Sequence, residues 1–265
     1  MSFGPILTRD DGQRIQRICP PKELEGLLEA VFFLRGPIMD SAGGDPETAW
    51  QKLGGAASGI PLIAPIQVHG TAVLEEREIW AVPTRPKADG ILLTRGNCAG
   101  SLRFADCFPL LLSSSHPRPW AMMLHAGFEG TAKGILSDAV GFLRGQIPGF
   151  RPDRTAAWIG PGIGPCCYER KKDQDAKTAL GMSNFPPRSW TDLGESVRFD
   201  IQKALRIQLL SLGLPEERLF IHGLCTSCNP GELYSYRTGD RTCRTFFVVR
   251  CGPEVHNIRP WWENI

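Results

Sequence analysis

The sequence has no apolar run long enough to cross a membrane. Its longest such run, around Leu110–Leu112, is far shorter than the roughly 18 residues that a transmembrane helix needs. The first residues, MSFGPILTRDDGQR, also lack the apolar segment and small-residue cleavage site of a secretory signal. We therefore expect no membrane partner and a cytoplasmic location.

An excess of charge of either sign is also absent. The net charge is +2, and the 30 basic and 28 acidic side chains are mixed along the chain. Because there is no basic stripe and no polybasic amphipathic segment, nothing in the sequence favours binding to nucleic acid. The nine cysteines, an odd number, are scattered through the 265 residues, and we expect mostly reduced thiols rather than a disulfide framework.

Short apolar or alternating runs between glycines and prolines predict a fold rich in strands. The expected strands cover a hairpin at 1–20 and the ranges 31–34, 63–68, 72–74, 90–94, 101–105, 110–113, 120–125, 219–224 and 245–249. Apolar residues at helical spacing predict amphipathic helices over 132–146 and 195–212, and shorter helices over 21–29 and 47–53. The rest of 36–59 is expected to be a long loop, and 171–192 a polar surface excursion. Mixed strands with few, external helices are typical of an α+β fold.

Three residues dominate the chemistry that the sequence offers. His69, Cys107 and His125 each lie where an apolar run breaks into a turn, a position from which a strand end delivers a side chain to an open rim. Two imidazoles and a thiolate form a three-ligand zinc set with the fourth position open. They also form a Cys/His nucleophile pair. A lone histidine or cysteine is more often structural, and the residues by themselves leave both functional readings open.

Other motifs are less specific. The single pair Cys225-Thr-Ser-Cys228 does not by itself support a four-thiolate zinc site, and we interpret it as structural or incidental. The glycines of 160–164 fit either a tight turn or a backbone that approaches a ligand. The turn 127–131 before a helix could seat an anion. The motif Tyr-Ser-Tyr-Arg at 234–237 suits base stacking and phosphate contact, or an ordinary strand end.

Six motifs in order resemble the laccase-domain proteins, a family once labelled multicopper polyphenol oxidases and now understood as zinc-dependent purine nucleoside enzymes. They are QVHG (67–70), ADG (88–90), ADCFPLLL (105–112), HAGFEGT (125–131), IGPGIGPCCYE (159–169) and YSYR (234–237). The resemblance implies a single domain over 1–265 with four layers, α/β/β/α, and mixed sheets. It also implies phosphorolysis of adenosine, inosine, guanosine and methylthioadenosine, together with hydrolytic deamination of adenosine.

The same resemblance assigns roles to individual residues. It implies that His69, Cys107 and His125 are the zinc ligands and the catalytic centre, with phosphate as co-substrate and purine nucleosides as small-molecule partners. The substrate-binding residues that it implies are Arg35, Gln67, Asp106, Tyr236 and Arg237. A monomer or a small homo-oligomer is expected.

The chain departs from the family pattern at three places, one of which is the loop after the family's substrate arginine, poorly matched by Pro37–Pro46. The family usually has Trp-Arg where this chain has Phe128-Glu129, and a second arginine where Thr238 stands. Two alternative functions are kept: a copper-dependent polyphenol oxidase and a metal-free hydrolase with Cys107 as nucleophile. Only five histidines are present and none forms a His-X-His pair, which disfavours a true multicopper oxidase.

Overall fold

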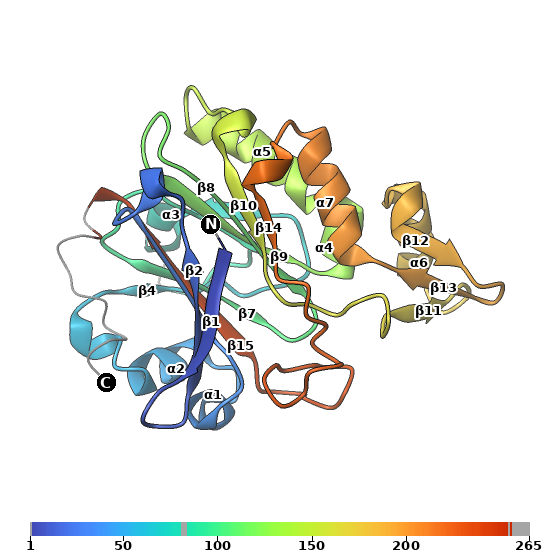
Figure 1. The fold of residues 1–265 in the computed structure, drawn as a ribbon, viewed down its shortest axis with the longest axis horizontal. Helices are drawn as coiled ribbons and strands as arrows, with labels where there is room; N and C mark the ends of the chain where they lie inside the picture. The colour runs from blue at the N-terminus through green and yellow to red at the C-terminus, as the bar shows by residue number, and fades with distance from the viewer. Residues whose placement is uncertain (1, 81–83, 254, 256–265) are drawn as a thin grey trace.

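The computed structural model describes residues 2–80, 84–253 and 255, and two six-stranded mixed sheets form its centre (Figure 1). The first sheet has, in spatial order, β1 (Ser2–Thr8), β2 (Arg14–Cys19), β3 (Leu28–Phe33), β15 (Thr245–Cys251), β7 (Ala99–Phe104) and β4 (Leu62–Ile63). The second has β14 (Leu219–Ile221), β10 (Ala156–Ile159), β8 (Phe108–Ser114), β9 (Trp120–Ala126), β6 (Gly90–Leu93) and β5 (Val73–Glu75). A third, small sheet has β11 (Glu169–Lys171), β13 (Ser196–Phe199) and β12 (Trp190–Asp192).

Helices cover the two large sheets from opposite sides (Figure 1). On the first sheet lie α1 (Pro37–Ala42) and α2 (Pro46–Lys52), and on the second lie α4 (Phe128–Lys133), α5 (Ile135–Gln146) and α7 (Ile201–Ser211). The remaining α-helices are α3 (Glu76–Trp80) and α6 (Ala176–Asn184), and short 3-10 helices span Lys22–Leu24, Ala56–Ser58, Pro152–Arg154, Pro187–Ser189 and Glu216–Arg218. Within the described residues, no helix combines the length and apolar character that a membrane crossing requires.

Three buried clusters define the layers. The central cluster joins the facing sides of the two sheets, and in it the rings of Phe32 and Phe247 stack with centroids 4.0 Å apart. A second cluster joins the outer face of the second sheet to α5 and α7, and a third packs Trp50 of α2 on the first sheet. The expected α+β class, with mixed sheets in an α/β/β/α order, is confirmed.

Several local predictions were wrong in informative ways. The helix expected over 195–212 is strand β13 followed by α7, and Asp200 marks the boundary because its carboxylate accepts a hydrogen bond from the backbone N–H of Lys203. The helix expected over 132–146 is interrupted at Gly134, whose φ is +91°. The strand expected over 63–68 ends at Ile63. The 36–59 segment contains α1 as well as α2. In place of the helix expected over 21–29 there is a 3-10 turn, Lys22–Leu24, followed by the start of β3 at Leu28. The polar 171–192 excursion carries α6 and β12.

His222 connects the two sheets at one edge and gives the fold a pH dependence. It follows β14, and its Nε2 lies 2.7 Å from Oε1 of Gln16 on β2. Burial lowers the pKa of His222 to about 4. Because the unfolded chain takes up the proton at higher pH, this contribution to stability is complete above pH ~6.5 and is lost as the pH falls toward about 4.

We therefore expect the free energy of unfolding to fall by about 2 kcal/mol between about pH 7.5 and pH 4.5 from this residue alone. Urea unfolding at both pH values measures it. His222→Gln keeps a hydrogen-bond donor without titrating, so its unfolding free energy should change less over the same interval. Equal pH dependence in both proteins would contradict the assignment.

Candidate metal centre and substrate cavity

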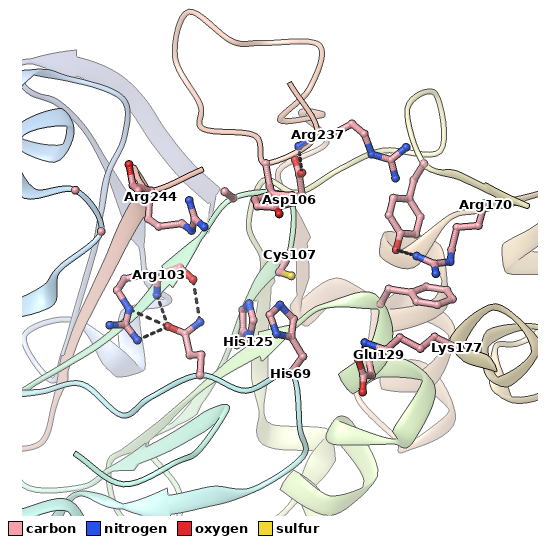
Figure 2. A pocket seen from close by; sticks show the side chains of 18 residues that line it. His69, Arg103, Asp106, Cys107, His125, Glu129, Arg170, Lys177, Arg237 and Arg244 are labelled. Atoms are coloured by element: carbon pink, nitrogen blue, oxygen red, sulfur yellow. Dashed lines mark hydrogen bonds and ion pairs between the residues drawn. The ribbon is translucent and has the colours of Figure 1, made fainter. Parts of the chain in front are cut away.

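The structure brings the three central residues of the sequence analysis together. His125 lies near the end of β9, Cys107 lies between β7 and β8, and His69 lies in the loop after β4 rather than at a strand end. Their ligand atoms are all within 4.8 Å of one another. Figure 2 shows the three side chains pointing toward one another at the base of a pocket. The spacing suits one shared ion.

Asp89, to which the sequence analysis assigned no role, organises both histidines. Its buried carboxylate accepts backbone hydrogen bonds from Val68, His69 and Gly70, at 3.1, 3.0 and 2.7 Å, and so holds the turn that carries His69. It also lies 2.7 Å from Nδ1 of His125. If Nδ1 carries the proton, Nε2 of His125 is left as a free ligand atom. In the sequence, only the ADG motif at 88–90 pointed to this aspartate.

Two residues of the candidate metal centre have unusual backbone φ angles. Among the described residues, His69 (φ +58°) and Asp106 (φ +83°) are the non-glycine residues with positive φ. Such angles cost of order 1 kcal/mol or more each and persist where the surrounding contacts enforce them. Two hydrogen bonds hold the positive φ of Asp106. The hydroxyl of Thr226 donates to its Oδ1 at 2.7 Å, and the backbone N–H of Arg237 donates to its Oδ2 at 2.8 Å.

Before any metal ion binds, the surroundings of Cys107 and His125 favour the neutral forms of both side chains. Burial, with the nearby carboxylates of Asp106 and Asp89, raises the pKa of the Cys107 thiol to about 12. Burial lowers the pKa of His125, and its hydrogen bond to Asp89 only partly opposes this. A thiolate at Cys107 near neutral pH therefore requires a cation beside it, which a metal ion would supply.

Gly127 makes room for the cluster. A Cβ atom there would lie 2.7 Å from Sγ of Cys107 and 3.4 Å from Cδ2 of His69. The donor set, the fixed orientation of His125 and this clearance together fit a four-coordinate zinc ion with one position open.

We expect Gly127→Ala to weaken metal binding by about 10-fold or more, because the added methyl group would displace Cys107. Competition with a chromophoric chelator measures the affinity. Gly141→Ala is the matched control: it lies in α5 with nothing within 4 Å of the added Cβ, and it should leave metal affinity unchanged. Equal affinity in the two variants would show that the clearance at Gly127 is unimportant.

A cavity of about 750 Å³ opens above the cluster (Figure 2). Its walls carry the aromatic rings of Phe128, Tyr168 and Tyr236. They also carry five cationic side chains, Arg103, Arg170, Lys177, Arg237 and Arg244, against the acids Asp106 and Glu129. A pocket of this size accommodates a small organic anion or a nucleoside with a phosphate.

The residues expected to bind substrate occupy different positions. Gln67, Asp106, Tyr236 and Arg237 all line the cavity. The amide oxygen of Gln67 accepts from the backbone N–H, Nε and Nη2 of Arg103 at 2.9–3.0 Å, so it holds that arginine in place.

Arg35 is not among the lining residues. Its guanidinium pairs with Asp240 at 2.5 Å, donates to the carbonyl oxygen of Leu233 and lies 4.3 Å from the centroid of the Tyr234 ring. In this structure Arg35 supports the loop that carries Tyr236 and Arg237.

Glu129, the acid at the position where the resemblance leads us to expect an arginine, is paired with two lysines. Lys133 lies 2.7 Å from its Oε1 and Lys177 lies 2.6 Å from its Oε2. These two hydrogen bonds lower the pKa of Glu129. Lys177, on α6, thus brings a cation to the wall of the cavity that carries Glu129.

Gly160 and Gly162, in the glycine run at 160–164, serve packing rather than contact with a ligand in the cavity. A Cβ on Gly162 would lie 2.6 Å from the ring of Phe108, and one on Gly160 would lie 2.9 Å from Phe32. These glycines do not line the cavity. The alternative in which the backbone of this run approaches a ligand in the cavity is therefore not supported.

The helix after Gly127 is α4, which is only six residues long, and we assign no anion-binding site to its N-terminus.

Comparison with known proteins places the chain in a family. Residues 48–251 match the family described as multi-copper polyphenol oxidoreductase laccase, and the chain belongs to it.

Its relatives include proteins named purine nucleoside phosphorylase. YlmD of Geobacillus stearothermophilus is 34% identical over 156 residues, which are 57% of this chain and 55% of that protein. PA4543 of Pseudomonas aeruginosa is 32% identical over 189 residues, 69% of this chain and 71% of that protein. The alignment with the first of these thus spans little more than half of the relative.

Solved structures share the fold. The crystal structure of YlmD from Geobacillus stearothermophilus superposes with a TM-score of 0.74 at 24% identity, covering 93% of this chain and 98% of that one. The structure of the hypothetical protein YfiH from Bacillus licheniformis gives 0.75 at 21% identity, covering 93% and 99%.

Proposed function

We propose that this chain is a zinc-dependent purine nucleoside phosphorylase acting on adenosine, inosine, guanosine and methylthioadenosine, with a second, hydrolytic adenosine deaminase activity. The observation that carries the proposal is one cavity that has a His/Cys/His cluster at its base and aromatic and cationic side chains on its walls. The names of the relatives support the same reaction class.

Each wall of the cavity suits one part of the reactants. Tyr168 and Tyr236 offer aromatic surface for stacking a purine, and Phe128, 7% exposed, packs against the Tyr168 ring. Within the described chain the guanidinium groups of Arg237 and Arg244 form no ion pair with a carboxylate. Arg244 already donates to the carbonyl oxygens of Asp240, Arg241 and Cys243, so Arg237 is the more open of the two to hold the oxygens of a phosphate. Arginines placed there would orient phosphate toward the anomeric carbon of the ribose, while negative charge develops on the departing purine.

His69, Cys107 and His125 would hold the metal ion, and Asp89 would orient the two histidines. When bound, a zinc ion supplies Lewis acidity and lowers the pKa of water in its open position, which suits hydrolytic release of ammonia from adenosine. Because the described cysteines are all free thiols, the protein also suits a reducing compartment such as the cytoplasm.

The test is an assay of the purified protein with its metal content measured. Inosine with phosphate should give hypoxanthine and ribose 1-phosphate, and no base should be released without phosphate. Adenosine without phosphate should give inosine and ammonia. Zinc-loaded protein that neither releases a base nor makes inosine would overturn the proposal.

The two alternative functions have less support. A metal-free hydrolase would need a Cys107 thiolate, which the raised pKa of that thiol opposes. Turnover that survives complete metal removal would favour it. A copper oxidase would show copper rather than zinc after purification and would oxidise phenols.

Glu129→Gln should strengthen phosphate binding, because it releases Lys177 and Lys133 from their shared carboxylate. We expect KM for phosphate to fall by about 3- to 10-fold at low ionic strength, with a smaller change at high salt. Initial rates at varied phosphate measure it. Glu169→Gln, an exposed carboxylate outside the cavity, is the control and should leave KM unchanged. A higher KM in Glu129→Gln would show that Glu129 organises the cations rather than masking them.

A further inference from the structure

A second group of sulfur ligands lies outside the cavity. Cys166, Cys167, Cys225 and Cys228 place their four Sγ atoms within 4.8 Å of one another. The Sγ of Cys228 lies 3.5 Å from that of Cys166 and 3.4 Å from that of Cys167. The sequence contains a single CxxC pair, Cys225–Cys228. The fold supplies the second pair, because β10 and β14 run parallel and their following turns end side by side.

We propose that these four cysteines bind a structural zinc ion, distinct from the ion at His69, Cys107 and His125. Zinc–sulfur bonds of about 2.3 Å in a tetrahedron place the sulfurs about 3.8 Å apart, which matches the observed separations. An iron–sulfur cluster would need its cysteines further apart, because several metal and sulfide atoms lie between them. Binding replaces four S–H protons with one zinc ion and involves no redox change.

The surroundings of the sulfurs resemble those of a metal-thiolate site. Both pairs lie on turns: the backbone N–H of Cys167 donates to the carbonyl oxygen of Gly164, and that of Asn229 donates to Thr226. The backbone N–H of Gly164 also donates to Sγ of Cys225 at 3.2 Å, which would stabilise a bound thiolate. A Cβ on Gly164 would crowd Sγ of Cys166 at 3.2 Å and Sγ of Cys225 at 3.5 Å. Glycine leaves this space free.

The ion would join the turn that leads into Tyr168 of the cavity wall to the turn that supports Asp106. Tyr168 directly follows Cys167 and lines the cavity. Thr226 directly follows Cys225, and its hydroxyl holds the carboxylate of Asp106 at 2.7 Å. A cross-link between the turns would therefore stabilise Asp106, the neighbour of Cys107, without touching substrate.

Zinc content and thiolate count test the proposal on the full chain. Purified under reducing conditions, the wild type should contain two zinc ions per chain by native mass spectrometry. Cys228→Ser should lose one, whereas Cys19→Ser, an exposed cysteine outside both groups, should keep two. The cysteine variant should also melt about 5–10 °C lower than the control.

Two further measurements make the result decisive. His125→Ala should keep the zinc of the four-cysteine group, so failure of the proposed function and failure of this site give different stoichiometries. If Cys228→Ser does not fold, the absorption spectrum of the cobalt-substituted wild type still reports the number of thiolate ligands. Thiolate-to-cobalt charge transfer should be about five times that of a single-thiolate site, since five cysteines bind two ions.

Three outcomes would overturn the assignment. They are one zinc ion per chain with an unchanged content in Cys228→Ser, an iron-containing red protein, and a mass lowered by pairs of hydrogens that reveals disulfides among the four cysteines.

Discussion

His125→Ala should abolish metal binding at the cavity and lower kcat/KM for inosine phosphorolysis by about 10³-fold or more. His125 is the most buried of the three ligands, 4% exposed, and its orientation is fixed by Asp89 at 2.7 Å. Removing it takes away one of three protein ligands and leaves a cavity beside Cys107. Zinc content and steady-state kinetics on the same preparation measure both effects.

Two companion variants separate metal loss from damage to the fold. His125→Ala also leaves Asp89 without its imidazole partner, so Cys107→Ala is made in parallel, because it removes a ligand and leaves that hydrogen bond intact. Both should lose the zinc ion of the cavity and the activity together. His116→Ala, an exposed histidine, should behave as wild type. Cys107→Ala with full zinc content and normal turnover would rule out the metal centre.

Asp89→Asn should reduce zinc affinity by about 10- to 100-fold, the usual effect of removing a carboxylate behind a metal-bound histidine. The fully buried carboxylate serves three backbone N–H groups and His125. An amide has only one acceptor oxygen, so at least one donor loses its partner and stability should fall by about 1–3 kcal/mol. Isothermal titration with zinc and urea unfolding measure the two quantities.

Asp138→Asn is the control, because Asp138 is an exposed aspartate on α5. Excess zinc should restore much of the activity of Asp89→Asn, since its three ligands remain. If its zinc affinity equals that of the wild type while stability falls, Asp89 acts on the fold alone.

The strands and helices that depend on local residue patterns could be predicted from the sequence. Short apolar runs located β8 and β9, which are completely buried, and helical spacing located α5 and α7. Val197 misled the prediction because it continues the four-residue spacing of Ile201 and Leu205 while lying in strand β13. The capping Asp200 was the signal that could have separated strand from helix.

Long-range pairings were beyond the reach of the sequence. Nothing in the spacing of Cys166–Cys167 and Cys225–Cys228 indicates that parallel strands bring these pairs into contact. The hydrogen bonds that Asp89 makes to both ligand-bearing segments, and the support that Arg35 gives to the 234–240 loop, likewise appear only once the chain is folded.

The place of β15 within its sheet determines when a growing chain can complete the candidate metal site. It lies between β3 and β7 and pairs Phe246 with Phe33, although it is the last strand of the described chain. His69, Cys107 and His125 therefore leave the ribosome long before this strand can close the sheet, and before Thr226 and Arg237 can fix Asp106. Pairing of such distant segments is slow, and until then β3 and β7 expose unpaired edges. A nascent or truncated chain thus carries every ligand of the cavity ion but none of the confinement that would select its substrate.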